Sequence, residues 1–257
     1  MSGIRSRTAP EYKSNRLLRP EQRPVLKRFL AELSGRAHVH VIDKTSYVAT
    51  RVLELFTGEP SYGDGTRLGR DFAASVDALV SRTDFLASFL VLTRTKRLRL
   101  LDHGAIDRFF ALLPAELSIS RRRVEETLLR LIEDDPAIPP PLEPLVPALA
   151  ETALFWSGGR RSVAVVHDEQ SALTPGRVSR LADYLAEAVV PAPPPLTGVR
   201  QVDSRLDPRV QAADLLAGVA RRAAEVPGLE EILRAECRGL IGGADVAGTE
   251  PKTRRMS

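Results

Sequence analysis

Two side chains near the end of the sequence, Gln211 and Asp214, have types and a spacing that could support metal or substrate binding. They stand three residues apart, so in a helix they share one face. The neighbours of Asp214 are mostly Ala and Leu. A carboxylate in such a setting faces the core only when something compensates it, usually a cation. We therefore predict Asp214 as a metal ligand and Gln211 as a residue that holds this carboxylate or the substrate.

Two further carboxylates, Asp43 and Asp168, each follow a run of residues that reads as a strand. The carboxyl ends of parallel strands share one edge of a sheet, so both acids could converge there with Asp214. Converging carboxylates repel unless Mg²⁺ or Mn²⁺ holds them, and such oxygen-rich sites suit metal-assisted phosphodiester hydrolysis. His167, beside Asp168, could orient the ligands. The alternative is that each Asp simply caps the helix that follows.

Other residues with chemical potential have simpler explanations. His38 and His40 point to one side of a strand, as metal ligands can, but no third ligand is in register, and packing explains them as well. The single cysteine, Cys237, cannot form an internal disulfide and reads as a half-buried helix residue. The sequence has no nucleotide-binding, hydrolase or thiol signature of the glycine-rich, GxSxG or CxxC type.

The elements that must position these residues alternate between helices and strands. Apolar spacing, caps and turn residues predict strands over 38–43 and 160–169 and at Val199–Val202, with helices over 20–33, 45–56, 67–92, 104–113, 119–134, 142–155, 174–190, 208–222 and 227–240. The proline-rich segment from Asp134 to Pro144 reads as an extended connection. This order predicts an α/β fold with a mixed sheet flanked by helices. We expect one domain over 1–240 with a mostly helical insert at about 67–155, and a disordered tail over 241–257.

Composition and charge bear on partners and compartment. The chain has 257 residues, a formal net charge of +4 and 43% apolar residues, which suffices for a substantial core. The apolar runs are shorter than the roughly 20 residues of a membrane span, and the polar start has no leader-like apolar region. We therefore expect no membrane association and a cytoplasmic location.

One dense basic cluster, RTKRLRL, could bind nucleic acid through Arg94, Lys96, Arg97 and Arg99. A second cluster, RRR, lies at Arg121–Arg123. Two alternatives remain open for the positive charge. The clusters could be solvated helix faces, and the preference for Arg over Lys could reflect the base composition of the genome.

Three segments together resemble the family known as domain of unknown function 3800, whose members are ribonuclease H-like in fold. The segments are APEYKSNRLL from Ala9, HVHVIDKTSYVATRVLELF from His38, and VDSRLDPRVQAADLLAG from Val202. The last is the most specific, since a Ser after a strand is followed by Gln-x-x-Asp-Leu-x-x-Gly on the closing helix. SVAVVHDE also resembles a later core strand of that family.

The resemblance implies a ribonuclease H-like domain with a metal-dependent nuclease-like site. Its leading acids would be Glu11, Asp43 and Asp214, with Asp168 nearby. Lys13, Lys44, Ser204, Gln211 and Glu169 would support them. Family members usually begin with a strand that carries an Asp-Glu-Ser-Gly-like motif, and the ten residues before Glu11 contain no such motif. We therefore expect that this chain lacks the N-terminal strands, through a downstream start, through decay, or because a partner chain or second copy completes the sheet.

Two functions follow as hypotheses. The first is a divalent-metal-dependent nuclease that uses Mg²⁺ or Mn²⁺ to hydrolyse phosphodiester bonds, and is therefore a hydrolase. The second is a non-catalytic module of the same fold that binds nucleic acid or protein.

Overall fold

The computed structural model describes residues 14–94, 99–222, 229 and 241–243. The chain is a mixed α/β protein that is mostly helical. It divides into two compact units, which are described separately. Unit 1 consists of Met1–Val41, Ala164–Ser171 and Gly198–Gly243, and unit 2 consists of Ile42–Val163, Ala172–Thr197 and Ala244–Ser257.

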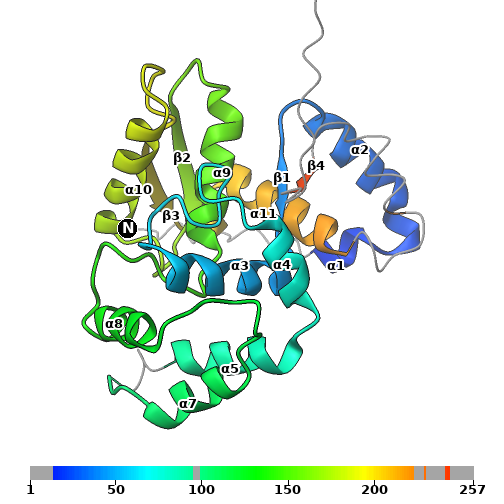
Figure 1. The fold of residues 1–257 in the computed structure, drawn as a ribbon. Coiled ribbons are helices and arrows are strands. Elements are labelled where there is room, and N and C mark those ends of the chain that lie inside the picture. Colours follow the sequence, from blue (N-terminus) through cyan, green and yellow to red (C-terminus); the bar gives the residue numbers. More distant parts are fainter. Residues whose placement is uncertain (1–13, 95–98, 223–228, 230–240, 244–257) are drawn as a thin grey trace, which may run out of the picture. The chain divides into compact units, whose positions relative to one another are not determined.

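Unit 1 is built around two helices and a short strand pair (Figure 1). Apart from the larger parts of two strands that form a second pair, described below, its elements are α1 (Ser14–Leu17), the 3-10 turn η1 (Pro20–Gln22), α2 (Arg23–Leu33), β1 (Val39–Val41), the 3-10 turn η2 (Ser204–Leu206), α11 (Pro208–Arg221) and β4 (Ile241–Gly243). Leu26 and Leu30 of α2 pack against Leu216 and Val219 of α11, and Leu229 completes this core. The predicted helices at 20–33 and 208–222 are thus confirmed. The predicted helix at 227–240 lies outside the described residues, apart from Leu229.

The strand pair of unit 1 joins distant parts of the chain. β1 pairs in parallel with β4, and His40 lies opposite Gly242. We expected residues 241–257 to be a disordered tail, but 241–243 form a strand, while 244–257 lie outside the described residues. β1 is also shorter than the predicted strand and is only half-buried, with 47% of Val41 exposed.

A second two-stranded sheet pairs β2 (Val163–Asp168) with β3 (Leu196–Val202). The amide of Val163 donates to the carbonyl of Pro195 at one end, and the amide of Ser204 donates to Asp168 at the other. Both contacts run in the same direction along the two chains, so the strands are parallel. This confirms the predicted strand–helix–strand order across 160–202. The prediction of one sheet holding all strands is wrong for the described residues, where two separate strand pairs occur.

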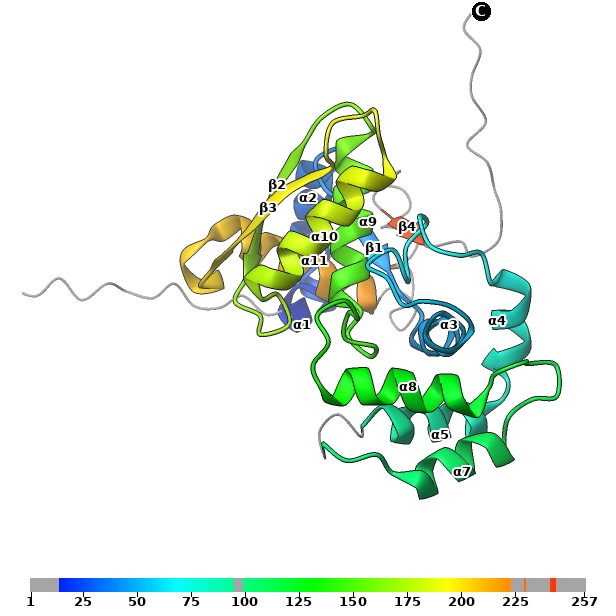
Figure 2. The same ribbon diagram turned by 60° about the vertical axis from the view of Figure 1, so that its left-hand side comes forward.

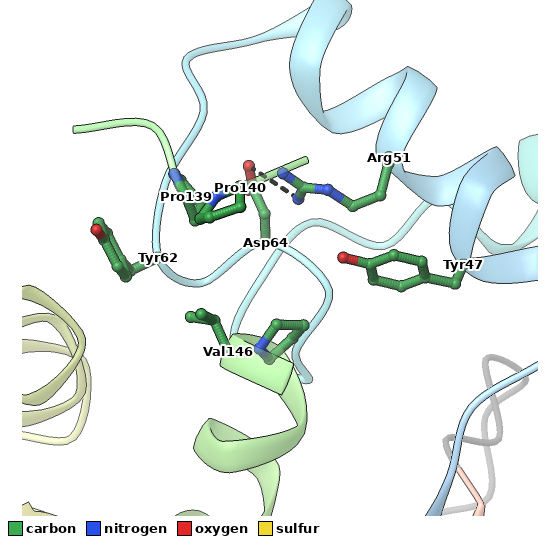
Figure 3. A pocket seen from close by; sticks show the side chains of 8 residues that line it. Tyr47, Arg51, Tyr62, Asp64, Pro139, Pro140 and Val146 are labelled. Carbon is green, nitrogen blue, oxygen red and sulfur yellow. Dashed lines mark ion pairs between the residues drawn. The ribbon is translucent and has the colours of Figure 1, made fainter. Parts of the chain in front are cut away.

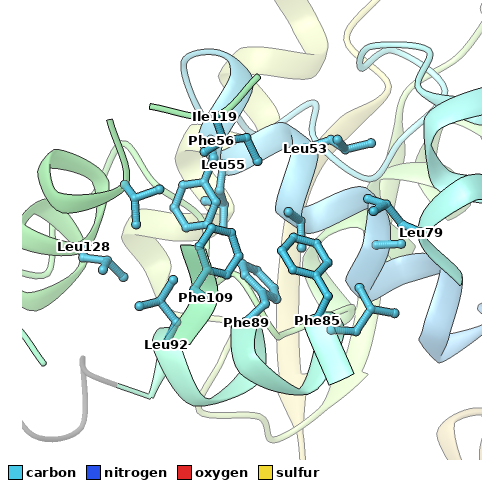
Figure 4. Close-up of a cluster of buried hydrophobic side chains, with 14 of the residues drawn as sticks. Leu53, Leu55, Phe56, Leu79, Phe85, Phe89, Leu92, Phe109, Ile119 and Leu128 are labelled. Atoms are coloured by element: carbon cyan, nitrogen blue, oxygen red, sulfur yellow. The ribbon is translucent and has the colours of Figure 1, made fainter. Parts of the chain in front are cut away.

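Unit 2 is a helical assembly with its own apolar core (Figure 2). Its helices are α3 (Lys44–Thr57), α4 (Ala73–Val80), α5 (Thr83–Thr93), α7 (His103–Ala111), α8 (Arg121–Ile132), α9 (Leu145–Ser157) and α10 (Pro175–Ala188). Phe109 is fully buried at the centre, with its ring 5.5 Å from that of Phe56 and 5.0 Å from that of Phe85 (Figure 4). Because α3 contributes Val52, Leu55 and Phe56, the helical core begins before the expected insert.

Caps decide where several helices begin. The side chain of Asp43 accepts the amide of Ser46 at the start of α3, and that of Thr174 accepts the amide of Arg177 at the start of α10. Asp207 caps α11 in the same way, directly before Pro208. Caps of this kind satisfy amides that have no partner within the helix. These starts were predictable because the motif is local.

Candidate functional site

The predicted site on α11 begins with a firmly held first turn. Asp207 accepts from the amide and the guanidinium of Arg209, and the hydrogen bonds from that guanidinium lower the pKa of Asp207 to about 2. The next turn carries Gln211, which is half-buried, and Asp214, which is exposed. Leu216 and Val219 form the buried side of the helix. Asp214 therefore lies on the solvent side of α11, and the compensated, core-facing position that its apolar neighbours suggested is not observed.

A chain of hydrogen bonds within unit 1 brings three predicted site residues together. The amide of Ser204 donates to Oδ1 of Asp168 at 3.0 Å, and Nε2 of Gln211 donates to the carbonyl of Ser204 at 3.0 Å. The chain joins the end of β2, the turn after β3 and the second turn of α11. Gln201 adds a further link, since its side chain accepts the amide of Gln170 at 2.6 Å.

Asp168 keeps its negative charge in this arrangement. The hydrogen bonds from Ser204, first of all from its amide, lower the pKa of Asp168. A carboxylate that is ionised at neutral pH is the form that a hard cation binds. His167 Nδ1 lies 2.8 Å from the backbone oxygen of Asp168, and Glu169 is exposed just beyond the strand.

Asp43 caps the helix that follows it, which is the alternative to metal binding that its position in the sequence left open. It lies in unit 2, is exposed, and caps α3, because its Oδ1 accepts the backbone amide of Ser46 at 2.7 Å. That hydrogen bond lowers the pKa of Asp43. Lys44 is the first residue of α3 and is also exposed.

Two of the predicted site residues, Glu11 and Lys13, lie outside the described residues. Across the ranges that the structure describes, no group of three or more His, Cys, Asp or Glu side chains could hold a metal ion. The predicted convergence of Asp43, Asp168 and Asp214 is therefore not seen as a complete ligand set. What is observed is the smaller arrangement of Asp168, Ser204 and Gln211.

The basic clusters differ from one another. Arg94 and Arg99 are exposed, and Arg99 lies 3.7 Å from Asp134, whereas Lys96 and Arg97 lie outside the described residues. Each arginine of the RRR cluster at the start of α8 pairs with an acid: Arg121 with Asp107 and Glu125, Arg122 with Glu126, and Arg123 with Glu59. Acidic neighbours therefore offset much of the positive charge of that cluster.

A buried ionic cluster in unit 2 was not predicted. Arg51 of α3 places Nη1 3.5 Å from Asp64 (Figure 3). The same Nη1 lies 2.6 Å from Glu54, and Nε of Arg51 donates to the carbonyl of Pro141 at 3.2 Å. The exposed fractions of Arg51, Glu54 and Asp64 are 2%, 1% and 5%. Nη2 of Arg51 is buried and has no hydrogen-bond partner among the described residues.

Arg51 and Asp64 of the cluster line one side of a small hollow. Tyr47, Tyr62, Pro139, Pro140, Val146 and Pro147 complete its lining (Figure 3). Burial is the main cause that raises the pKa of Glu54, with the nearby Asp64 adding to it. Burial likewise raises the pKa of Tyr47 to about 12. Two acids thus share one guanidinium inside the protein.

A signal for this cluster is present in the sequence. Arg51 and Glu54 stand three residues apart within an apolar helical run, where charged side chains are seldom fully buried unless they are paired. The third member, Asp64, lies in the turn residues GEPSYGDG, and Pro141 is 90 residues away from Arg51. Only the tertiary structure brings them together.

Comparison of the chain with protein-family models, with curated proteins and with solved structures found no match. Within the described part of the chain, no helix combines the length and the apolar character needed to cross a membrane.

Proposed function

We propose that the chain is a ribonuclease H-like protein that hydrolyses phosphodiester bonds with the help of Mg²⁺ or Mn²⁺. The observation that carries the proposal is the hydrogen-bond chain from Asp168 through Ser204 to Gln211. It joins two of the segments that resemble the family, SVAVVHDE through Asp168 and VDSRLDPRVQAADLLAG through Ser204 and Gln211. Asp214 follows Gln211 by one helical turn.

The acidic site residues of unit 1 are of the chemical type that binds a divalent metal. Asp168 and Asp214 would hold the ion, and both supply the hard oxygen donors that Mg²⁺ and Mn²⁺ prefer. These two acids are too few to form a complete ligand set, because a third acid is not found with them among the described residues. The resemblance offers Glu11 for this position. A bound metal would activate water and neutralise charge on the phosphate.

The chain's own groups would orient the substrate and the ligands. The amide of Ser204 holds Oδ1 of Asp168 in place, so the position of this carboxylate is fixed relative to the turn after β3. The Gln211 side chain holds the turn through the Ser204 carbonyl, so it sets the distance between that turn and α11. Exposed arginines such as Arg94 and Arg99 would attract the phosphate backbone.

The second candidate is a module that binds nucleic acid or protein without cleaving it, alone, as a homo-oligomer or with a partner chain. The specific observation in its favour is that the described acids do not form a three-membered ligand group. Asp43 in particular is engaged as a helix cap. Under this reading, the fold would bind through its surface charge.

Cleavage assays with single-stranded and double-stranded DNA and RNA, each with Mg²⁺ or Mn²⁺, distinguish the nuclease from the binding module. The nuclease proposal predicts cleavage that Asp168→Asn and Asp214→Asn abolish. Asn keeps an oxygen that can accept the Ser204 amide, so Asp168→Asn removes charge with little change in structure. Asp77→Asn, on the exposed face of α4, is the matched control and should retain activity. Binding that weakens steeply with salt, without cleavage, would support the second candidate.

A further inference from the structure

Within the described residues of unit 2, the two longest irregular segments both contact the buried cluster around Arg51 of α3. The first segment, 58–72, joins through Glu54, which accepts the amide of Gly65, and through Asp64, which contacts Arg51. The second segment, 133–144, joins through the carbonyl of Pro141, which accepts from Arg51 Nε. The cluster therefore links three parts of the chain that share no continuous secondary structure.

Further contacts hold the same two segments in place. The Tyr47 hydroxyl of α3 donates to the Pro141 carbonyl at 3.4 Å, and the Tyr62 hydroxyl donates to the Pro136 carbonyl at 3.2 Å. Gly63 has no room for a side chain, since a Cβ there would stand 2.0 Å from the Tyr184 hydroxyl. The segments are thus closely fitted, and Tyr47, Tyr62 and the prolines line a small hollow together with Arg51 and Asp64.

The charges of the cluster do not balance when all its groups are ionised. Arg51 supplies one positive charge, while Glu54 and Asp64 supply two negative charges, and all three side chains are buried. Buried charge without a partner is costly. With a proton on Glu54, Arg51 faces one anion, and the carboxyl of Glu54 can still accept the Gly65 amide through its second oxygen.

We propose that Glu54 acts as a latch that depends on its protonation. When Glu54 is protonated, segments 58–72 and 133–144 stay packed against α3. When Glu54 is ionised, these segments separate from α3 more readily and the hollow is exposed. The direction follows from linkage. The pKa of Glu54 is raised in the folded state by burial, so its stabilising contribution is complete below the ordinary pKa and is lost as pH rises through the raised value.

Other titratable groups face the cluster, and their effects on pH dependence must be distinguished from that of Glu54. They are Asp64 from the first segment, Glu143 from the second, Tyr47 of α3, Tyr184 of α10 and Tyr62. The raised pKa values of the tyrosines place their titration above neutral pH. Asp64 and Glu143 remain as competing acids, and a substitution of Glu54 alone distinguishes them.

Amide hydrogen exchange of the full chain between pH 5 and 8, corrected for the intrinsic pH dependence of exchange, tests the latch. We expect the protection of residues 61–66, and of Ala137 and Ile138 in the second segment, to fall as pH rises, by about tenfold for each unit by which the closed-state pKa of Glu54 exceeds the open-state value. Glu54→Gln should remove this dependence. Glu187→Gln, which changes an exposed glutamate of α10 outside both segments, should leave it unchanged.

Three results would overturn the proposal. One is protection of these segments that does not depend on pH in the wild-type protein. Another is a pH dependence that persists in Glu54→Gln, which would assign it to Asp64 or Glu143. Should Glu54→Gln fail to fold, the amide resonance of Gly65 in the wild-type protein decides, because it must shift with pH alongside the loss of protection. A Gly65 resonance that stays constant would contradict the latch.

Discussion

Replacing Arg51 by Met should unfold unit 2 far more readily, because it leaves Glu54 and Asp64 buried without their cation. Removing one partner of a buried ion pair costs about 3–5 kcal/mol. For a chain of this size, each kcal/mol lowers the melting temperature by roughly 2–4 °C, so the expected decrease is roughly 6–20 °C. Thermal unfolding followed by circular dichroism at neutral pH measures it.

Two further variants test whether the stability is lost because buried charges are left uncompensated. Arg122→Met removes an arginine whose side chain is 88% exposed and paired with Glu126, and it should leave the melting temperature unchanged within error. The triple variant Arg51→Met, Glu54→Gln, Asp64→Asn removes every charge of the cluster but keeps oxygens for the Gly65 and Ser61 amides. It should recover most of the lost stability. A triple variant as unstable as Arg51→Met alone would refute the charge argument.

Further predictions concern the core and the caps. Phe109→Ala removes the ring that packs against Phe56 and Phe85, and it should lower the free energy of unfolding by about 3–5 kcal/mol in a denaturant titration; a loss below about 1 kcal/mol would contradict the central position of that ring. Asp43→Ala removes the cap on α3 and should cost about 1 kcal/mol at neutral pH. Since the pKa of Asp43 is lowered in the folded state, its contribution is present above the ordinary pKa and is lost as pH falls, so the difference between the wild type and Asp43→Ala should disappear in acid. A difference that persists at low pH would show that the cap does not act through the carboxylate.

Local sequence features predicted several helix starts, whereas the helix predicted over 67–92 is in fact two helices, α4 and α5, and begins only at Ala73. Asp207 followed by Pro208, and Thr174 followed by Pro175, mark helix starts that the structure confirms. A cap acts on amides two or three residues away, so its effect needs no tertiary partner. The start of α3 after Asp43 follows the same rule.

Strand pairing was less predictable. The sequence IGG at 241–243 has neither alternation nor β-branched enrichment beyond one Ile, yet it pairs with β1. A backbone ladder can form wherever a chain meets an open strand edge, whatever its side chains. The one-sheet expectation therefore did not hold within the described residues.

The candidate site shows a similar limit. An Asp at the end of a strand can cap a helix or bind a metal, and residue type alone does not separate the two uses. Asp43 caps α3, whereas Asp168 accepts an amide from a different part of the chain, 36 residues away. The Arg51 cluster was not predicted for a similar reason. The apolar helix around Arg51 indicates burial, but the compensating Asp64 lies in a turn that only the tertiary structure brings close.

The proposed function requires that Asp168 and Asp214 bind a divalent metal, whatever nucleic acid the protein acts on. Mn²⁺ binding to the full chain, followed by electron paramagnetic resonance, therefore tests it most directly. The proposal predicts a bound ion in the wild type and in Asp77→Asn, and affinity at least about tenfold weaker in Asp168→Asn and in Asp214→Asn, as loss of a ligand entails. Equal Mn²⁺ affinity in all four proteins would contradict it.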